Sequence, residues 1–553
     1  MGRHVKPGNV RALHGLALMG VLLVGCAGTT DLPPGSTASL EVMPGAAAVP
    51  VGGSVKLESI VRNQDGIPVP NAQVTWRTAN PTAAIVNASG LVSGQAVGEA
   101  WIFASSGFLE DSALVTVYGE VTGPAITINP AVTYQVITGW EGVAQIGELA
   151  CNPVAVENYR GPLMDRVVNE LGLNRVRLEV PSGRENPNDY FADLLAGVIT
   201  LPQYRMTAYT IINDNGDPNV IEPSGFQFGA IDYIVEYIVL PMRQRLAARG
   251  ESLYVNLNYV DFGSSTFEHY NSPAEYAELI LATFLHMQSR WGFVPDGVEI
   301  ILEPDNVAAW TPARIGAMIV ATSNRLRAAG FEPDFIAPST TNATTSLTYL
   351  NGVLAVPGVA DVLTEFSYHR YSGVSAGVLM NIGNTAAQRG LRTSMLEHIG
   401  SGHEDLHQDL KLARVSSWQQ YTIAFCTQDN GAQYYRIDDS NPSNPQVILG
   451  SRTRFLTQYF RDVRAGALRV DATSTLAALD PLAFVNQGGG TVVVVKAAAG
   501  ASFHVVGLPG GTYGIRYTTD AEFAHDLADV TIPAGAPLAA SIPARGVVTV
   551  YRK

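Results

Sequence analysis

Cysteine and charge are both scarce in this chain of 553 residues. Its three cysteines are too few for a disulfide scaffold, and charged residues make up only 15% of the sequence. The net charge of −14 leaves no basic stripe for phosphates, which argues against nucleic acid as a partner. Plentiful Gly and Pro, with 54 and 32 residues, and a hydrophobic fraction of 46% suit a loop-rich, β-containing protein of about three domains.

The N-terminal hydrophobic run, LALMGVLLVG at residues 16–25, is too short to span a bilayer comfortably. It follows several basic residues and ends at Cys26, as in a secretion signal. The segment LVGC resembles a bacterial lipobox, which implies cleavage before Cys26 and lipidation of its sulfur. A plain signal peptide with an incidental cysteine is the alternative. We therefore expect a lipoprotein signal at 1–26, a linker at 27–37, and an exported bacterial envelope lipoprotein that a lipid at Cys26 anchors to the membrane.

Residues 38–119 read as a run of short alternating strands, such as SVKLESIVR, QVTWRTA and ALVTVYG, with turn residues between them. The order of landmarks is G-x-SVKL, then DGIPVPNAQVTW, then AAIVNASGLVSGQAVGEAWIFA. This order resembles a bacterial immunoglobulin-like domain of the second type (Big2). The resemblance implies a spacer or a weak adhesive module, and the segment carries no catalytic constellation.

From 125 to 466 the pattern changes to a strand followed by a helix, eight times over. Eight such units predict a (β/α)8 TIM barrel, and the short strands of 467–553 predict a C-terminal β-sandwich. The predicted barrel strands are 134–143, 174–180, 253–260, 297–304, 334–340, 362–371, 392–399 and 432–438. The predicted helices include 159–172, 232–250, 272–292, 311–330, 403–425 and 451–466.

Two glutamates end strands on opposite sides of the predicted barrel. Glu303 follows the apolar stretch GVEII on the fourth strand, and Glu397 lies near the end of the seventh, in LRTSMLEHIG. Active sites of TIM barrels lie where the strands end, so the two carboxylates are expected at the same mouth. A separation of about 5 Å would suit a retaining glycosidase, with Glu303 as general acid and Glu397 as nucleophile.

At this point the sequence resembles glycoside hydrolases of clan A, and family 30 in particular. Three features carry the resemblance: the Glu-Pro of the fourth strand with the seventh-strand Glu, the glycine-rich TGWEGVA at 138–144, and the join TRFLTQYFRDVRAGALRVDATS. The resemblance implies a barrel with a side β-domain, no cofactor, a carbohydrate substrate, and Glu303 and Glu397 as the acid/base and nucleophile.

The chain departs from the clan at Leu302. Clan members usually have Asn before the acid/base Glu, and that Asn binds the sugar 2-hydroxyl. On strand alternation Leu302 points at the helices instead. Either Asn306 replaces the usual Asn from the following loop, or the substrate differs at C2.

Further candidates end the neighbouring strands. Tyr371 would hold the nucleophile through its hydroxyl, and Arg177 would keep Glu397 ionised, unless Arg177 forms only a structural salt bridge. Glu179, on the face of Arg177, remains a rival carboxylate. The other residues that we expect to bind substrate or to support the site are Trp140, Glu141, Asn258, Tyr259 and His369. For Trp140 the alternative is a place in the core.

Two expectations concern cysteines and metals. Cys151 falls in the loop after the first strand, at the top of the barrel, and Cys426 follows a predicted helix that should end at the bottom. We therefore expect two separate free thiols. His403 and His407 share a helix face, and HEDLH has the H-E-x-x-H spacing of zinc proteases. We interpret both histidines as loop and helix-start residues and expect no catalytic metal.

Three functional hypotheses remain open. The first is an exported, monomeric enzyme that hydrolyses a β-linked glycan or glycoside with retention. The second is a catalytically inactive barrel that acts as a surface carbohydrate-binding or adhesive protein, which Leu302 and the Big2 spacer favour. The third is an inverting hydrolase, which a carboxylate separation well above about 6.5 Å would favour.

Overall fold

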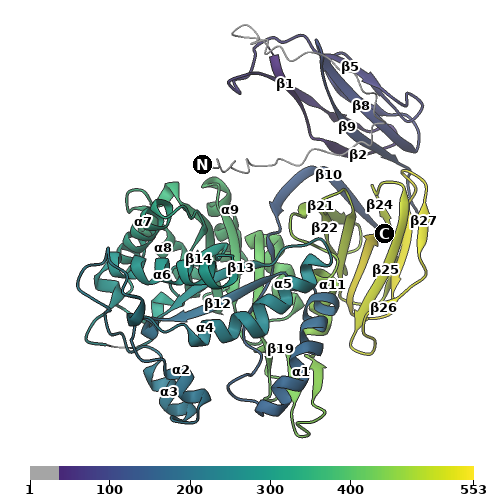
Figure 1. Cartoon of the computed structure of the whole chain (residues 1–553). Helices are drawn as coiled ribbons and strands as arrows, with labels where there is room; N and C mark the ends of the chain where they lie inside the picture. The colour runs from purple at the N-terminus through teal and green to yellow at the C-terminus, as the bar shows by residue number, and fades with distance from the viewer. Residues whose placement is uncertain (1–36, 264) are drawn as a thin grey trace, which may run out of the picture.

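The computed structural model describes residues 37–263 and 265–553 (Figure 1). The signal predicted at 1–26, its Cys26 and all but the last residue of the predicted linker lie outside the described residues. Among the residues described, no helix has both the length and the apolar character that crossing a membrane requires.

The first domain is a sandwich of short strands at the N-terminal end of the described chain (Figure 1). One sheet has the order β2-β9-β8-β5, a second has the order β3-β7-β6, and β1 pairs with β4. Trp76 packs against its apolar core. The strands are β1 (Thr37–Met43), β2 (Ala46–Pro50), β3 (Ser54–Lys56), β4 (Glu58–Asn63), β5 (Thr75–Thr78), β6 (Ala84–Val86), β7 (Leu91–Gly94), β8 (Gly98–Ser106) and β9 (Leu109–Tyr118).

The second domain is a closed parallel barrel, so the predicted TIM-barrel fold is confirmed. Strands β11 to β18 pair in chain order, and β11 also pairs with β18 to close the ring. The barrel strands are β11 (Gly139–Val143), β12 (Arg175–Pro181), β13 (Tyr254–Val260), β14 (Gly297–Glu299), β15 (Asp334–Asn342), β16 (Leu363–Ser372), β17 (Arg392–Glu397) and β18 (Val415–Phe425).

The eighth strand was predicted wrongly. The helix expected at 403–425 is only α10 (His403–Gln408) and the π-helix η8 (Asp409–Ala413), after which β18 begins. The strand expected as the eighth, β19 (Gln433–Asp438), instead pairs with β18 outside the barrel and is followed by β20 (Gln446–Leu449). Polar residues made β18 hard to recognise as a buried strand. Gln419 and Gln420 are buried, and their amides donate to the carbonyls of Leu396 and Ser401.

Helices surround the barrel and follow its strands, as the teal and green coils of Figure 1 show. In α7 the predicted start is present: Thr311 caps the helix, Pro312 occupies its first turn, and Ile315, Met318 and Ile319 are buried. The other helices are α1 (Pro153–Arg166) with η1 (Val167–Leu171), α4 (Gly229–Ile234) with η4 (Val235–Val239) and α5 (Leu240–Ala247), α6 (Pro273–Trp291), α7 (Pro312–Ala328), α8 (Ala343–Leu354), α9 (Ala376–Gln388) and α11 (Thr453–Phe460).

A long segment, residues 182–228, connects β12 to α4 at the end of the barrel where the strands finish. It contains the turn η2 (Ser182–Arg184), α2 (Tyr190–Leu195), α3 (Leu201–Thr207) and the turn η3 (Pro223–Gly225). Phe191, Tyr204 and Ala230 form a small apolar cluster of their own beneath it. We call residues 182–228 the β12–α4 segment.

The C-terminal strands form a sheet with the order β26-β25-β29-β23-β22-β21-β10-β24-β28, in which β27 pairs with β25. Its strand β10 (Ala125–Val136) precedes the barrel in the chain, within the range predicted for the barrel domain. The others are β21 (Leu468–Ser474), β22 (Leu479–Val485), β23 (Thr491–Ala497), β24 (Ala501–Val506), β25 (Gly511–Thr519), β26 (His525–Asp526), β27 (Val530–Ile532), β28 (Leu538–Ile542) and β29 (Gly546–Arg552).

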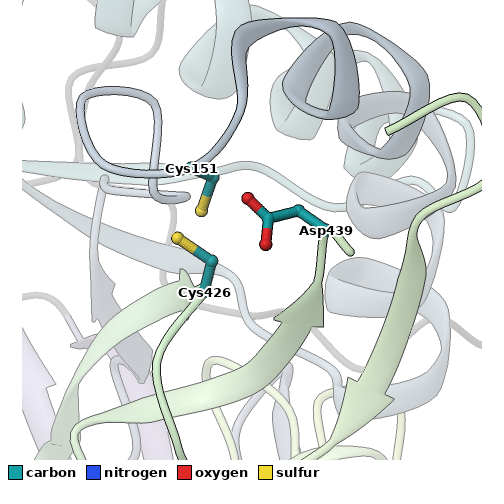
Figure 2. A group of neighbouring side chains, drawn as sticks. All are labelled: Cys151, Cys426 and Asp439. Carbon is teal, nitrogen blue, oxygen red and sulfur yellow. The ribbon is translucent and has the colours of Figure 1, made fainter. Parts of the chain in front are cut away.

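The two cysteines predicted to lie far apart are neighbours. Both are free thiols, but an oxygen of Asp439 and the sulfurs of Cys151 and Cys426 all lie within 4.8 Å of one another. Figure 2 shows the two thiols facing each other beside the Asp439 carboxylate. The prediction that the two cysteines lie far apart was wrong because the helix expected at 403–425 does not form. Cys426 instead follows strand β18, so it lies at the same end of the barrel as the loop after β11.

This proximity predicts that mild oxidation joins the two thiols. Burial raises the pKa of the Cys151 thiol, so the reaction will be slow near neutral pH and faster under alkaline conditions. Treatment with a small-molecule disulfide, followed by peptide mapping, should identify a Cys151–Cys426 cross-link within one chain. Mixed disulfides on both cysteines, with no cross-link, would contradict the placement of β18.

Candidate active site

Glu303 lies at the tip of the fourth strand, in a left-handed conformation with φ of 51°. The regular pairing of β14 ends at Glu299, yet the backbone continues between its neighbours: the Leu302 N–H donates to the Tyr259 carbonyl, and the Glu303 N–H donates to that of Ser339. These bonds hold the carboxylate at the mouth of the barrel, where 13% of the side chain is exposed.

The Glu303 carboxylate has two polar partners. Its Oε1 lies 3.1 Å from Nδ1 of His369, which comes from β16, and its Oε2 accepts a hydrogen bond of 2.8 Å from the Asn306 amide. His369 is fully buried, and its Nε2 has no hydrogen-bond partner in the described part of the chain. Asn306, expected as a substitute sugar ligand, thus contacts the carboxylate itself.

Glu397 ends β17 and is held from two sides. One oxygen forms a salt bridge with the fully buried Arg177 of β12, and the other accepts a hydrogen bond of 2.9 Å from the Tyr371 hydroxyl. Arg177 also bonds to Glu179 at 3.0 Å and to the Leu396 carbonyl at 3.3 Å. Only 8% of the Glu397 side chain is exposed, so these bonds determine its position.

The surroundings of Glu397 keep it ionised. Burial acts to raise its pKa, but the charges of Arg177 and His369, with the hydrogen bonds from Arg177 and Tyr371, outweigh burial, and the pKa lies below its usual value. The pKa of Tyr371 shifts in the opposite direction, because burial and the Glu397 charge raise the pKa of its hydroxyl. The site therefore contains a stable carboxylate anion next to a neutral phenol.

The structure brings the two predicted carboxylates together. An oxygen of Glu303, an oxygen of Glu397 and a nitrogen of His369 all lie within 4.8 Å of one another. Such a group has the spacing of metal ligands, but the cation of Arg177 already balances Glu397. This charge compensation disfavours a metal ion and leaves two acid groups in reach of one small ligand.

Two further residues belong to the site. Glu179 lies beside Arg177, and burial, only partly offset by the Arg177 charge, raises its pKa. Tyr421 of β18 lies near the same carboxylates, since the charge of Glu179, then burial and the charge of Glu397, raise the pKa of its hydroxyl. Glu179 was recognised as a rival carboxylate, whereas Tyr421 was missed because it fell within the helix predicted at 403–425.

Three candidates do not reach the site. Trp140 lies in the core, stacked on Phe460 with ring centroids 4.5 Å apart. Glu141 is fully buried in the barrel interior, where it forms a salt bridge with Arg175. Tyr259 points out of the barrel, with its hydroxyl 2.9 Å from Nδ1 of His269. Alternation explains the errors for Trp140 and Tyr259, since neighbours on a strand face opposite sides.

Two more positions singled out from the sequence are Asn258 and Leu302. Asn258 shares a face of β13 with Asn256, whose amide donates to Glu141 and Glu299, so it points into the barrel. It is fully buried, and neither amide atom has a partner among the described residues. Leu302 is buried as well, so no side chain at this position offers a polar group to the mouth.

Comparisons with known proteins address two parts of the chain. Residues 36–117 match the family model of the bacterial Ig-like domain (group 2), so this segment is a Big2 domain as predicted. No curated protein matches the chain.

Solved structures share the fold of the remainder. A GH30 endoxylanase from Clostridium papyrosolvens aligns with 15% identity and a TM-score of 0.54, over 78% of this chain and 100% of that one. The catalytic domain of GH30 xylanase C from Talaromyces cellulolyticus has 15% identity and a TM-score of 0.56, over the same shares of both chains. An endo-β-1,6-glucanase has 14% identity and a TM-score of 0.54, over 87% and 99%. At these identities the likeness establishes a fold found in glycoside hydrolases of clan A.

The lowered pKa of Glu397 predicts a pH-dependent contribution to stability. In Glu397→Gln the free energy of unfolding should fall by about 2 kcal/mol at neutral pH, because Arg177 loses a charged partner. The ionised carboxylate stabilises the fold above its unfolded pKa, near 4.5, and this contribution is lost as the pH falls through the lower folded pKa. Urea unfolding from about pH 7 down to about pH 3 should therefore show the two proteins converging in acid.

The matched control is Glu332→Gln, which alters an exposed carboxylate between α7 and β15. Its difference from the parent should stay small at every pH. A Glu397→Gln difference that stays constant as the pH is lowered would contradict the lowered pKa.

Proposed function

We propose that the chain is a retaining glycoside hydrolase that cleaves a β-linked glycan or glycoside by double displacement. The observation that carries the proposal is the separation of the two carboxylates, whose nearest oxygens lie within 4.8 Å. Retaining enzymes hold their carboxyl groups about 5–5.5 Å apart, whereas inverting enzymes leave about 6.5–9.5 Å for a water molecule. The short separation supports attack on the sugar by a carboxylate rather than by water.

Glu397 has the properties of the nucleophile. Its lowered pKa keeps it ionised, and Arg177 and Tyr371 orient its two oxygens. In the first step one Glu397 oxygen attacks the anomeric carbon and forms a glycosyl ester. The Tyr371 hydroxyl remains available to the other oxygen as charge leaves the carboxylate.

Glu303 is placed to act as the acid and then as the base. Its partners are His369 and Asn306, and no arginine bonds to it among the described residues. In the first step it gives its proton to the glycosidic oxygen, so that the leaving sugar departs as an alcohol. In the second step it takes a proton from water, which attacks the anomeric carbon and releases Glu397.

The fold comparisons and the long β12–α4 segment support a polysaccharide as the substrate class. The structural neighbours are named for activity on xylan and on β-1,6-glucan, both β-linked polysaccharides. The β12–α4 segment extends over the same end of the barrel as the two carboxylates, and long loops at such a mouth usually contact substrate. Hydrolysis of a β-linked polysaccharide is therefore the activity to test first.

The inactive-barrel alternative rests on Leu302. It is less well supported than hydrolysis, because Arg177 and Tyr371 hold Glu397 within reach of Glu303, and this arrangement favours a working acid and nucleophile. The proposal includes a location and an oligomeric state. The protein is an exported, monomeric lipoprotein, anchored at Cys26, and the Big2 domain is a spacer between the membrane and the barrel.

Hydrolysis of a panel of plant and microbial β-glycans by the chain lacking 1–26 tests the proposal. The parent should release sugar from at least one glycan, and Glu303→Gln and Glu397→Gln should each lower kcat by at least about 100-fold. Glu332→Gln, again the surface control, should retain the parent rate. Activity that survives both substitutions would move the site elsewhere, and binding of a glycan without any turnover would support the inactive barrel.

The stereochemical outcome separates the two hydrolytic mechanisms. Proton NMR of the first product formed from a β-linked substrate should show the β anomer, because two inversions at the anomeric carbon restore its configuration. Initial release of the α anomer would establish inversion and would rule out a covalent intermediate on Glu397.

A further inference from the structure

A second group of carboxylates lies outside the candidate active site. Oxygens of Glu185, Asp214 and Glu275 all lie within 4.8 Å of one another. Glu278 follows Glu275 by three residues in α6, on the same side of the helix, and adds a fourth negative charge beside the group. Glu185 and Glu278 are fully buried, Glu275 is 6% exposed and Asp214 is half-buried, so most of this charge lies in the interior.

The described residues supply too little positive charge for this group. Arg325 approaches Glu278 at 3.4 Å, and Nε2 of His269 approaches Glu185 at 2.5 Å. Four carboxylates thus share one arginine and one histidine, which leaves an excess of buried negative charge.

Neutral donors satisfy only part of the group. The Asn213 side chain contacts Glu275 at 3.5 Å, and the Asp214 N–H donates to Glu185 at 3.1 Å. Oδ2 of Asp214 accepts from the Glu222 N–H at 2.7 Å and from the Asn215 amide at 2.9 Å. These bonds orient the carboxylates but do not balance their charge.

Several oxygens of the group have no partner in the described structure. They are Oδ1 of Asp214, Oε2 of Glu275 and Oε2 of Glu278, and the amide oxygen of Asn213 beside them is also unpaired. A buried, unpaired carboxylate oxygen is costly, and carboxylates as close as Glu185, Asp214 and Glu275 repel one another. Such a set is stable if a cation binds to it or if protons neutralise it.

We propose that Glu185, Asp214 and Glu275 bind a calcium ion, with the charge of Glu278 beside them. The available atoms are all oxygens. Several carboxylates, together with the side-chain carbonyl oxygen of Asn213, form the kind of set that calcium prefers. Zinc is disfavoured because the group contains no thiol and both nitrogens of His269 are engaged, by Glu185 and by Tyr259. Magnesium fits less well, since it binds few carboxylates and keeps most of its water.

Protonation is the competing explanation. Burial, the adjacent Glu275 and the charge of Asp214 raise the pKa of Glu278 to about 8, so in the absence of a cation this carboxyl group carries a proton near neutral pH. The two explanations therefore differ in their dependence on the metal.

The position of the group suggests what the ion does. Glu185 and Asp214 belong to the β12–α4 segment, whereas Glu275 and Glu278 lie in the first turns of α6. The same segment reaches the end of β13: the Ser182 hydroxyl donates to Asp261, and the Tyr209 ring packs edge-on against Phe262 with centroids 6.1 Å apart. A calcium ion would fasten this segment to the barrel and stabilise one conformation of the mouth.

The test uses the full chain, stripped with a chelator and then titrated with calcium chloride or magnesium chloride. Equilibrium dialysis should find one calcium ion per chain. Calcium should raise the Tm of the barrel transition by at least about 3 °C, and magnesium should raise it less. Glu275→Gln should weaken calcium binding at least about tenfold, whereas Glu332→Gln, which alters the exposed carboxylate between α7 and β15, should leave binding unchanged.

Two results would overturn the proposal. One is a stripped chain that binds no calcium in dialysis and has the same Tm with and without it. The other is equal calcium binding by the parent and by Glu275→Gln. Direct dialysis keeps the test valid even if the variant is less stable than the parent. Because no step depends on glycan hydrolysis, failure here leaves the proposed function untouched.

Discussion

The buried arginines of β12 are the constraint on which the barrel depends. Arg175 bonds to Glu141 and Glu365 with all three side chains fully buried, and Arg177 bonds to Glu179 and Glu397 one layer nearer the mouth. TIM-barrel interiors are usually filled by branched apolar side chains. Here charge pairs occupy those layers, and removal of one partner would leave an uncompensated charge in a dry interior.

These ion pairs also determine the register of the strands. A shift of β12 by one residue would turn both arginines toward the apolar layer between barrel and helices, away from their carboxylate partners. The penalty for such a slip exceeds what an apolar interior would impose, because buried charge costs more than misplaced hydrocarbon. The same pairs that hold the barrel in register thus deliver Glu397 to its place at the mouth.

The mouth is continuous with this polar interior. Arg177 bonds to Glu179 and Glu397, while His369 lies with the carboxylates of Glu303 and Glu397 in one cluster. The β12–α4 segment lies over the same end and has its own buried carboxylates. Burial of acidic groups is therefore a repeated feature of this barrel: one set is balanced by arginine, and the other has too few cations among the described residues.

Local sequence patterns were sufficient for the domain order and for the two principal glutamates. Alternating strands with turn residues identify the Big2 domain, and the caps and apolar face of α7 identify a helix, because such features involve residues near one another in the chain. Glu303 and Glu397 could be located because each follows a short apolar strand, and a barrel places strand ends at one mouth. Arg177 and Tyr371 were expected beside Glu397 by the same reasoning, and the structure has them there.

Only the tertiary structure decided the rest. The identity of β18 was hidden because its buried glutamines are satisfied by carbonyls of distant segments, so the strand does not read as apolar. Because of that one error, Cys151 and Cys426 were predicted to lie far apart, and Tyr421 was not predicted to lie near the site. The directions predicted for Trp140 and Tyr259 were wrong because alternation gives the relative direction of neighbouring side chains but not which of them points into the barrel. The carboxylate group of the β12–α4 segment and α6 joins residues far apart in sequence, and only folding brings their charges into contact.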